Sequence, residues 1–211
     1  MTTTEPTPID KATWGDGPWQ TEPDRVEWTH AGLPCLALRN KTFGGWCGYA
    51  AVPPGHPLHG VGYHDESPAL VDALERLKQR RLDVADVTFA RGIALLTGEV
   101  AASPDLVIDV HGGLTYADRC QGNICHVPKP GEPDDVWWFG FDCGHAGDFA
   151  PAIDATLRTI GARDETPYDH AAAIAAQDWH VEVYRTLDYV QAETNKLADQ
   201  LAAIAAGDRS V

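Results

Sequence analysis

The feature that most constrains the fold of this 211-residue chain is a long apolar stripe near its C-terminus. Apolar residues recur there at alternating spacings of four and three, with one polar interruption, as on one face of an α-helix. The stripe consists of Val183, Leu187, Val190, Thr194, Leu197, Leu201 and Ile204. It predicts helix from about residue 168 to 206. So regular a stripe must be buried, and we expect it to cover a sheet of the same chain; a homodimer seam is the alternative.

The first half of the chain predicts strands instead. Short apolar runs alternate there with turn residues, which is typical of an antiparallel meander. These runs are 25–29, 35–39 and 46–52, and further strands are expected at about 106–111 and 135–142. Strands therefore come early and helices late, without βα alternation. This order predicts an α+β fold with a small, mainly antiparallel sheet packed against a long C-terminal helix and one or two shorter helices.

The same pattern divides the chain into three parts. Residues 1–22 are rich in Thr, Pro, Gly and Asp and are expected to wrap loosely over the surface. Residues 23–165 form the α+β domain, in which 66–104 resembles an insertion, and 166–211 form a helical segment that packs on it. Ser67 and Pro68 predict a helix start, another short helix is expected at 154–160, and the stretch 82–104 fits neither helix nor strand clearly.

Composition and charge exclude several classes of protein. The net charge is −15 and no stripe of Lys and Arg stands out, which argues against direct nucleic-acid binding. The N-terminus lacks the basic and apolar regions of a signal peptide, and no apolar run approaches the roughly 18 residues that span a bilayer. We therefore expect a cytoplasmic protein without membrane contact. Its five cysteines should then be reduced, with no disulfide.

Chemically capable side chains follow two of the predicted strands, beside glycines that let a ligand approach the backbone. His111 follows the first, and Asp142, His145 and Asp148 follow the second. We expect His111, Asp142 and His145 to converge as catalytic residues. With Asp148 they would form a carboxylate and imidazole set that suits a divalent metal ion. Without a metal, one histidine could serve as a general base. The alternative is that Asp142 caps a turn and His145 is structural.

The cysteines give a weaker signal. Cys120, Cys125 and His126 suggest zinc, but the C-x4-C-H spacing contains no C-x2-C pair. Cys143 could be a nucleophile if an imidazolium lowered its pKa, although strand alternation favours its burial in the core. Gly112-Gly113 has no accompanying G-x-S-x-G motif, and neither a Walker A loop nor G-x-G-x-x-G occurs. These absences remove the common esterase, ATP-binding and dinucleotide-binding interpretations.

Aromatic and polar residues near these strands could bind a substrate. Tryptophan and tyrosine would stack on it, a histidine in a Pro-rich loop would close over it, and a threonine would donate a hydrogen bond. The substrate-binding candidates are Trp46, Tyr49, His56, Thr115, Tyr116 and Trp138.

Four motifs, WCGY at 46–49, GHP at 55–57, HGGLTY at 111–116 and DDVWWFGFDCGHAGD at 134–148, resemble a family of small uncharacterised proteins from bacteriophages and actinobacterial prophages. The resemblance covers roughly 26–65 and 106–205. It implies a phage-borne accessory role, such as nucleotide metabolism or countering host defence, and it carries no activity.

Three functions are open as hypotheses. The first is a small hydrolase acting on a compact polar, nucleotide-like substrate, with or without a divalent metal ion. The second is a protein that binds and sequesters such a small molecule without turnover, as an anti-defence protein would. The third is an acidic inhibitor of a host factor, for which the charge of −15 is the argument. A homodimer through the C-terminal helix is compatible with each.

Overall fold

The computed structural model describes residues 8–79, 101–126, 128, 130–131, 133–176, 178 and 180–207. A five-stranded sheet in the order β1-β2-β3-β5-β4 is at its centre, and all neighbouring strands are antiparallel. The strands are β1 (Arg25–His30), β2 (Leu33–Arg39), β3 (Trp46–Val52), β4 (Tyr116–Arg119) and β5 (Trp137–Asp142). The predicted meander and α+β class are confirmed.

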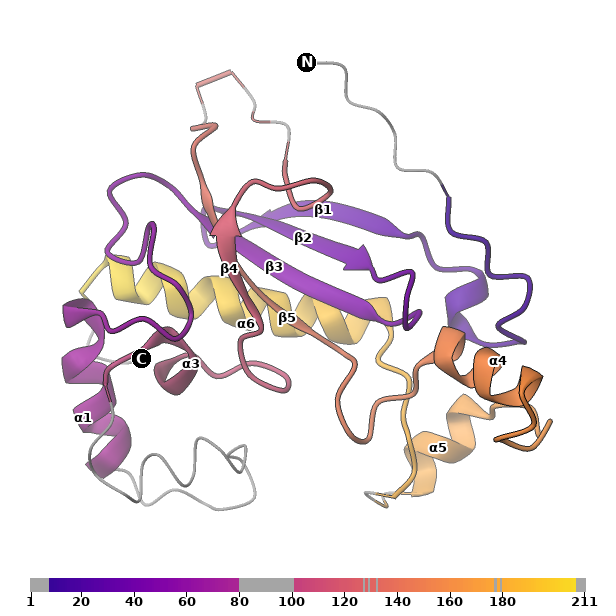
Figure 1. Ribbon diagram of the computed structural model, residues 1–211. Helices are drawn as coiled ribbons and strands as arrows, with labels where there is room; N and C mark the ends of the chain where they lie inside the picture. Colours follow the sequence, from indigo (N-terminus) through magenta and orange to yellow (C-terminus); the bar gives the residue numbers. More distant parts are fainter. Residues whose placement is uncertain are drawn as a thin grey trace.

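Helices lie on one face of this sheet and near both of its ends. They are η1 (Pro18–Gln20), η2 (Pro68–Leu70), α1 (Val71–Gln79), α3 (Pro104–Val107), α4 (Pro151–Thr159), α5 (His170–Ala176) and α6 (Leu187–Ala205). The long helix α6 runs along one face of the sheet, with α1 and α3 near one end and α4 and α5 near the other (Figure 1). The short helices predicted after Ser67 and around 154–160 are confirmed, the second beginning at Pro151.

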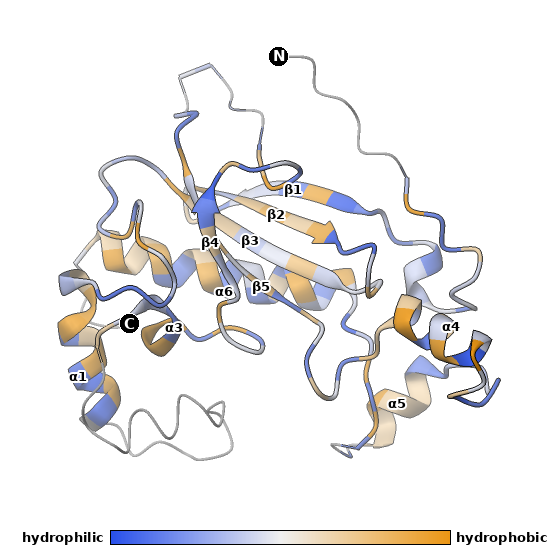
Figure 2. Cartoon of the chain, in the orientation of Figure 1, coloured by the Kyte–Doolittle hydropathy of each residue, from blue (hydrophilic) through white to orange (hydrophobic). Residues whose placement is uncertain are grey.

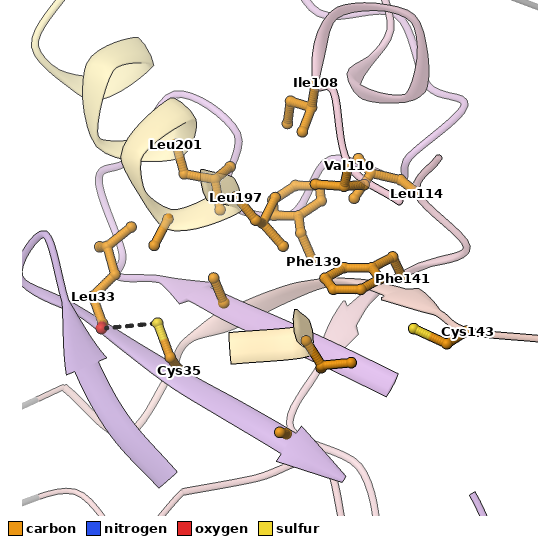
Figure 3. Packing of buried hydrophobic residues seen from close by; sticks show 14 of the residues in the cluster. Leu33, Cys35, Ile108, Val110, Leu114, Phe139, Phe141, Cys143, Leu197 and Leu201 are labelled. Carbon is orange, nitrogen blue, oxygen red and sulfur yellow. Dashed lines mark hydrogen bonds between the residues drawn. The ribbon is translucent and has the colours of Figure 1, made fainter. Parts of the chain in front are cut away.

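The apolar stripe of α6 is buried against the chain's own sheet. Val190, Leu197 and Leu201 have no solvent exposure, and α6 contacts β2 and β3. Figure 3 shows Leu197 and Leu201 close to Phe139 of β5. The expected packing is therefore confirmed for the part of the stripe that lies in α6. A homodimer stays a prediction, and it would need a face of α6 other than this stripe.

The prediction of one helix from 168 to 206 is wrong. The chain leaves helix after α5 and re-enters it only at Leu187. Val183 lies in the break, where it forms an isolated parallel bridge with Asp148. Thr186 caps α6 by accepting a hydrogen bond from the backbone N–H of Tyr189, which fixes the helix start. This break matters because it brings a non-helical segment beside the residues after β5.

The strand predicted at 106–111 is also wrong. Residues Pro104–Val107 form the one-turn helix α3, in which Pro104 occupies the first position, where proline has no N–H to lose. The buried residues Ile108 and Val110 follow α3 and anchor the chain in the core. Part of the predicted insertion 66–104 lies outside the described residues, but Leu70 and Ala102, near its two ends, are buried in the main core.

Residues 8–22 are anchored, although we expected the N-terminal segment to be loose. The ring of Trp19 has no solvent exposure and lies 5.5 Å from the ring of Phe149 and 5.1 Å from that of Tyr184. Lys11 donates hydrogen bonds to the carbonyl oxygens of Trp19 and Glu22. Burying a tryptophan removes a large apolar surface from water, which outweighs the loop-like composition of this segment.

Cys120 and Cys125 form a disulfide, so the prediction of five free thiols is wrong. Gln121 and Ile124 between them form an antiparallel bridge, which brings the two cysteine Cα atoms to 4.8 Å. That separation lies in the range that a disulfide requires. The pairing also removes both thiols as zinc ligands, which overturns the zinc interpretation of this segment. The remaining three cysteines are free and buried.

The sheet has a packed core on each face. Alternation along β5 places Trp137 on the α6 face and Trp138 on the other, as predicted. Figure 2 shows hydrophobic residues along the central strands and on α6. Among the described residues, no helix has the length and hydropathy needed to cross a bilayer.

A buried ionic network joins the N-terminal segment, the sheet and the segment before α6. The side chain of Arg39 has no exposure; it donates to Glu22 and Asp24 at 2.9 Å each and to the Tyr184 hydroxyl at 2.7 Å. Glu22 also accepts from the Tyr184 hydroxyl at 2.6 Å and from Trp46 Nε1 at 3.1 Å. Burial alone would raise the pKa of Glu22, but these hydrogen bonds outweigh it and lower that pKa. We call these five residues the Glu22–Arg39 cluster.

Candidate functional site

Two of the three predicted catalytic residues meet around a carboxylate. The rings of His111 and His145 approach edge to face with centroids 5.7 Å apart. His111 Nε2 lies 2.8 Å from Asp148 Oδ2, and the backbone N–H of His145 donates to the same oxygen at 3.0 Å. His111 follows the buried segment after α3, whereas His145 and Asp148 lie in the turn after β5. We call these three residues the His111 cluster.

Gly112 makes the approach of the two rings sterically feasible. Its φ of +66° is in the left-handed region, and a Cβ atom there would lie 2.2 Å from Cε1 of His145. Gly113 also has a positive φ, of +92°, but a Cβ on it would meet nothing within 4 Å. The first glycine is therefore required by the site, and the second only by the backbone turn.

Asp148 is the anchor of the cluster. Its side chain is 1% exposed, and Arg185 donates Nε–H to its other oxygen, Oδ1, at 2.8 Å. Burial by itself raises the pKa of Asp148, but hydrogen bonds from His111 and Arg185 outweigh that effect and hold the pKa below its usual value. Asp148 is therefore ionised at neutral pH.

His111 is held from both sides. Its Nδ1 lies 2.9 Å from the hydroxyl of Tyr189 in α6, and its backbone N–H donates to Glu193 at 3.0 Å. Burial and the nearby charge of Glu193 raise the pKa of Tyr189 to about 12, so this hydroxyl keeps its proton. With Nε2–H donating to Asp148, Nδ1 of His111 accepts from Tyr189. Both ring nitrogens are thus engaged.

His145 differs from its neighbour in having a free ring nitrogen. Its Nδ1 is buried and has no hydrogen-bond partner within the described part of the chain. This atom lies 3.8 Å from Asp142 Oδ1 and 3.8 Å from Asp148 Oδ2, beyond hydrogen-bond distance, and the side chain is 34% exposed. A buried polar atom without a partner is costly unless something binds it. Because this atom lies beside Asp148 and His111, it is a candidate position for a ligand, a proton or a metal ion.

The three side chains of the cluster fit a divalent cation. One ligand atom from each of His111, His145 and Asp148 lies within 4.8 Å of the other two. In a tetrahedral zinc site with bonds of about 2.0–2.1 Å, ligand atoms lie roughly 3.3 Å apart. Small movements of the side chains would therefore close the site, and three protein ligands would leave a fourth position open.

Asp142 is not part of this set. It lies at the end of β5, and its Oδ1 accepts a hydrogen bond from the backbone N–H of Gly144 at 3.0 Å. That is the turn-capping role we considered as the alternative. The predicted four-residue metal set is thus corrected to three residues, with Asp142 beside it at 3.8 Å from His145.

Burial rules out most of the predicted stacking residues. Trp46 and Trp138 have no solvent exposure and Tyr49 is 7% exposed, so none of these rings can stack on a ligand in this structure. Tyr116 lies on the face of the sheet opposite α6, where its ring packs edge-on against Tyr49 at 5.5 Å. Trp46, Tyr49 and Trp138 belong to the core and are not available to stack on a ligand, whereas Tyr116 is partly exposed and its binding role stays a prediction.

The two remaining predicted binding residues, His56 and Thr115, differ in their exposure to solvent. His56 is 8% exposed; its Nε2 donates to the carbonyl oxygen of Leu201 and its Nδ1 accepts from the backbone N–H of Leu58. It therefore ties its loop to α6, and burial lowers its pKa. Thr115 is exposed and its backbone N–H donates to Gly140. Its side chain remains a candidate for substrate contact.

Cys143 does not meet the requirements of a nucleophile. Its side chain is 2% exposed in the core on the α6 face, and burial raises its pKa far above neutral. The residues that the sequence reasoning missed are Arg185, Tyr189 and Glu193. They come from the break before α6 and from its first turns, a region that the sequence pattern presented as uniform helix.

A separate groove of about 550 Å³ lies between α4 and α5. Phe149, Tyr168 and Ala173 contribute apolar surface, and Arg158 and Arg163 are among its charged residues. Helix α5 itself consists mostly of exposed apolar residues (Figure 2). The volume of the groove lies within the range of small-molecule binding sites.

Comparison with known proteins does not assign the chain to a group. No protein-family model matches it, and neither a curated protein nor a solved structure is detectably similar to it. The resemblance to phage and prophage proteins stays a prediction. The function must therefore be inferred from the geometry of an α+β protein that carries a His/Asp cluster at one end of its sheet.

Proposed function

We propose that the protein is a small hydrolase that acts on a compact polar, nucleotide-like substrate at the His111 cluster. One observation carries this proposal: the buried Nδ1 of His145 has no partner among the described residues, although it lies beside an ionised carboxylate and a second histidine. The buried His56, which ties its loop to α6, has both ring nitrogens satisfied. His145 has unused capacity to bind a ligand or to take a proton.

A divalent cation fits this proposal, with His111, His145 and Asp148 as its ligands. Imidazole and carboxylate donors suit ions of the zinc and manganese type. Such an ion lowers the pKa of a bound water molecule toward neutral. The Tyr189 hydroxyl would then accept a hydrogen bond from His111 Nδ1–H and orient that ring, as partners of metal-bound histidines do. Arg185 would keep Asp148 ionised.

The activity can be tested with a panel of nucleotides and nucleotide-derived esters. The protein is incubated with each compound, with added Zn²⁺ or Mn²⁺ and separately with a chelator, and products are identified by mass spectrometry. We expect turnover that the chelator removes and that His145→Gln abolishes. His64→Gln is the matched control, because the side chain of His64 is 71% exposed and pairs with Asp105 away from the cluster. Turnover unchanged in His145→Gln, or none with any compound, would overturn the proposal.

A second function is supported by the groove between α4 and α5. Its volume of about 550 Å³ and its lining of both apolar and charged residues support the binding of a small polar molecule without turnover. A protein that sequesters such a molecule would release it intact on denaturation, whereas a hydrolase would release a product. Mass spectrometry of the supernatant after denaturing the loaded protein separates the two functions.

Two further proposals rest on the sequence. The charge of −15 supports an acidic inhibitor of a host factor, which a pull-down from host lysate tests.

The cytoplasm of a host cell is the proposed location. The Cys120–Cys125 disulfide argues against this location, because cytosolic thiols are kept reduced. Alkylation of the unfolded, unreduced protein should modify three thiols; five would show that the disulfide is absent.

A further inference from the structure

We infer that Arg185 is an oxyanion-binding residue beside the His111 cluster and that it receives a phosphoryl group of the substrate. The inference rests on the proposed function, because it names the substrate class for the same site. It begins with how Arg185 is held. Its Nε donates to Asp148 at 2.8 Å, and its Cζ lies 5.1 Å from the centre of the Tyr189 ring. The guanidinium is thereby fixed by an ion pair and by a cation–π contact.

The outer nitrogens of this guanidinium are unused. Among the residues that the structure describes, none accepts a hydrogen bond from Nη1 or Nη2 of Arg185. The side chain is 28% exposed. A planar guanidinium presents its donors in a fork that matches two oxygens of a phosphoryl or carboxylate group. Arg185 is therefore preorganised to bind an oxyanion next to His111 and Asp148.

The surrounding charges make this cation necessary. Asp142 and Glu193 lie near the cluster, and the whole chain carries −15, so an anionic substrate would be repelled without a local cation. Lys196 cannot replace Arg185, because its Nζ lies 2.7 Å from Asp109 and 3.9 Å from Glu193. A divalent ion at the cluster would add positive charge beside Arg185, which favours the doubly charged phosphoryl group over a carboxylate.

Inorganic phosphate is the probe for this inference, with acetate as the carboxylate comparison. Each anion is titrated calorimetrically into the full-length protein loaded with one equivalent of Zn²⁺. We expect phosphate to bind and acetate to bind more weakly. Arg185→Gln should weaken phosphate binding at least about tenfold, because it removes the charge-assisted hydrogen bonds that the guanidinium would donate. Arg119→Gln is the matched control, because the side chain of Arg119 is 78% exposed on β4.

Arg185→Lys is the variant that distinguishes a loss of phosphate binding from a loss of folding. Lysine keeps a positive charge near Asp148 but lacks the planar fork, so it should fold normally and bind phosphate less tightly than arginine does. Phosphate binding that is absent in the wild-type protein, or equal in wild type, Arg185→Gln and Arg185→Lys, would overturn the inference. If phosphate binds through Arg185 while no ester is hydrolysed, the subsite stands and the hydrolase proposal fails.

Discussion

The Glu22–Arg39 cluster and the His111 cluster are built in the same way but are satisfied to different degrees. Each centres on a carboxylate that accepts hydrogen bonds from several donors and pairs with an arginine. In the first, the carboxylate, guanidinium and hydroxyl groups bind one another. In the second, Nδ1 of His145 and the outer nitrogens of Arg185 have no partner in the described part of the chain.

This difference distinguishes the Glu22–Arg39 cluster, which stabilises the fold, from the His111 cluster, which is a candidate functional site. A buried polar network that is fully satisfied adds rigidity and stabilises the fold. A network with unused donors and acceptors is less stable at those atoms. Such a network is typical of a site where a bound molecule supplies the missing partners. Substitutions in the first cluster should therefore change stability, and substitutions at the rim of the second should change binding.

The largest expected effect is on stability, from Arg39→Ala. This change leaves Glu22 without its buried cation and Asp24 with Lys11 alone, and breaking a buried ion pair costs about 3–5 kcal/mol. The matched variant is His145→Ala, whose side chain is partly exposed and makes no side-chain hydrogen bond to the described residues, so it should cost less than about 1 kcal/mol. Urea unfolding followed by tryptophan fluorescence measures both. Equal losses in the two variants would break the comparison.

A smaller effect is expected from Glu22→Gln, and it should depend on pH. The pKa of Glu22 in the folded protein is below its usual value of 4.5, so its charge stabilises the fold above that pH. The contribution is lost as pH falls through the folded-state pKa. At pH 7 the variant should lose about 1–3 kcal/mol. The difference from wild type should shrink in urea titrations below about pH 4, and a difference independent of pH would contradict the assigned role.

The two neighbouring glycines give the finest test. Alanine at Gly112 or Gly113 meets a similar backbone strain of about 1–2 kcal/mol, because both have positive φ. Only Gly112→Ala places a methyl group against the His145 ring. We expect similar melting temperatures for the two variants and loss of Zn²⁺ binding in Gly112→Ala alone. Zn²⁺ binding that survives in both variants would show that the ring is free to move.

The sequence predicted the histidines and the carboxylate of the site better than the residues that hold them in place. Gly-flanked runs located His111, His145 and Asp148 because local chain turns bring such residues to one place. The spacing of three could not show that Asp142 caps the turn at Gly144 and lies beside the three-residue metal set. Arg185 could not be predicted, since its position depends on a helix break and on a bridge to a segment distant in sequence.

Prediction of the fold from the sequence was limited in the same way. Alternation and periodicity predicted the meander and the packing of α6, because both are set by which side chains must leave water. They could not show that Trp46 and Trp138 are completely buried, since either face of a strand can be covered by a distant segment. The anchoring of Trp19 and the Cys120–Cys125 disulfide likewise depend on tertiary contacts and on a tight turn.

The central claim, that the His111 cluster has unused coordinating capacity, is tested most directly by calorimetric titration of Zn²⁺ into wild-type protein and into His145→Gln. Loss of an outer partner already weakens metal binding about 10–100-fold, so loss of a ligand should weaken it at least as much. We predict one Zn²⁺ site in the wild type, absent or strongly weakened in His145→Gln, with the melting temperature nearly unchanged. Equal Zn²⁺ affinity in the two proteins, or no binding by the wild type, would contradict the claim.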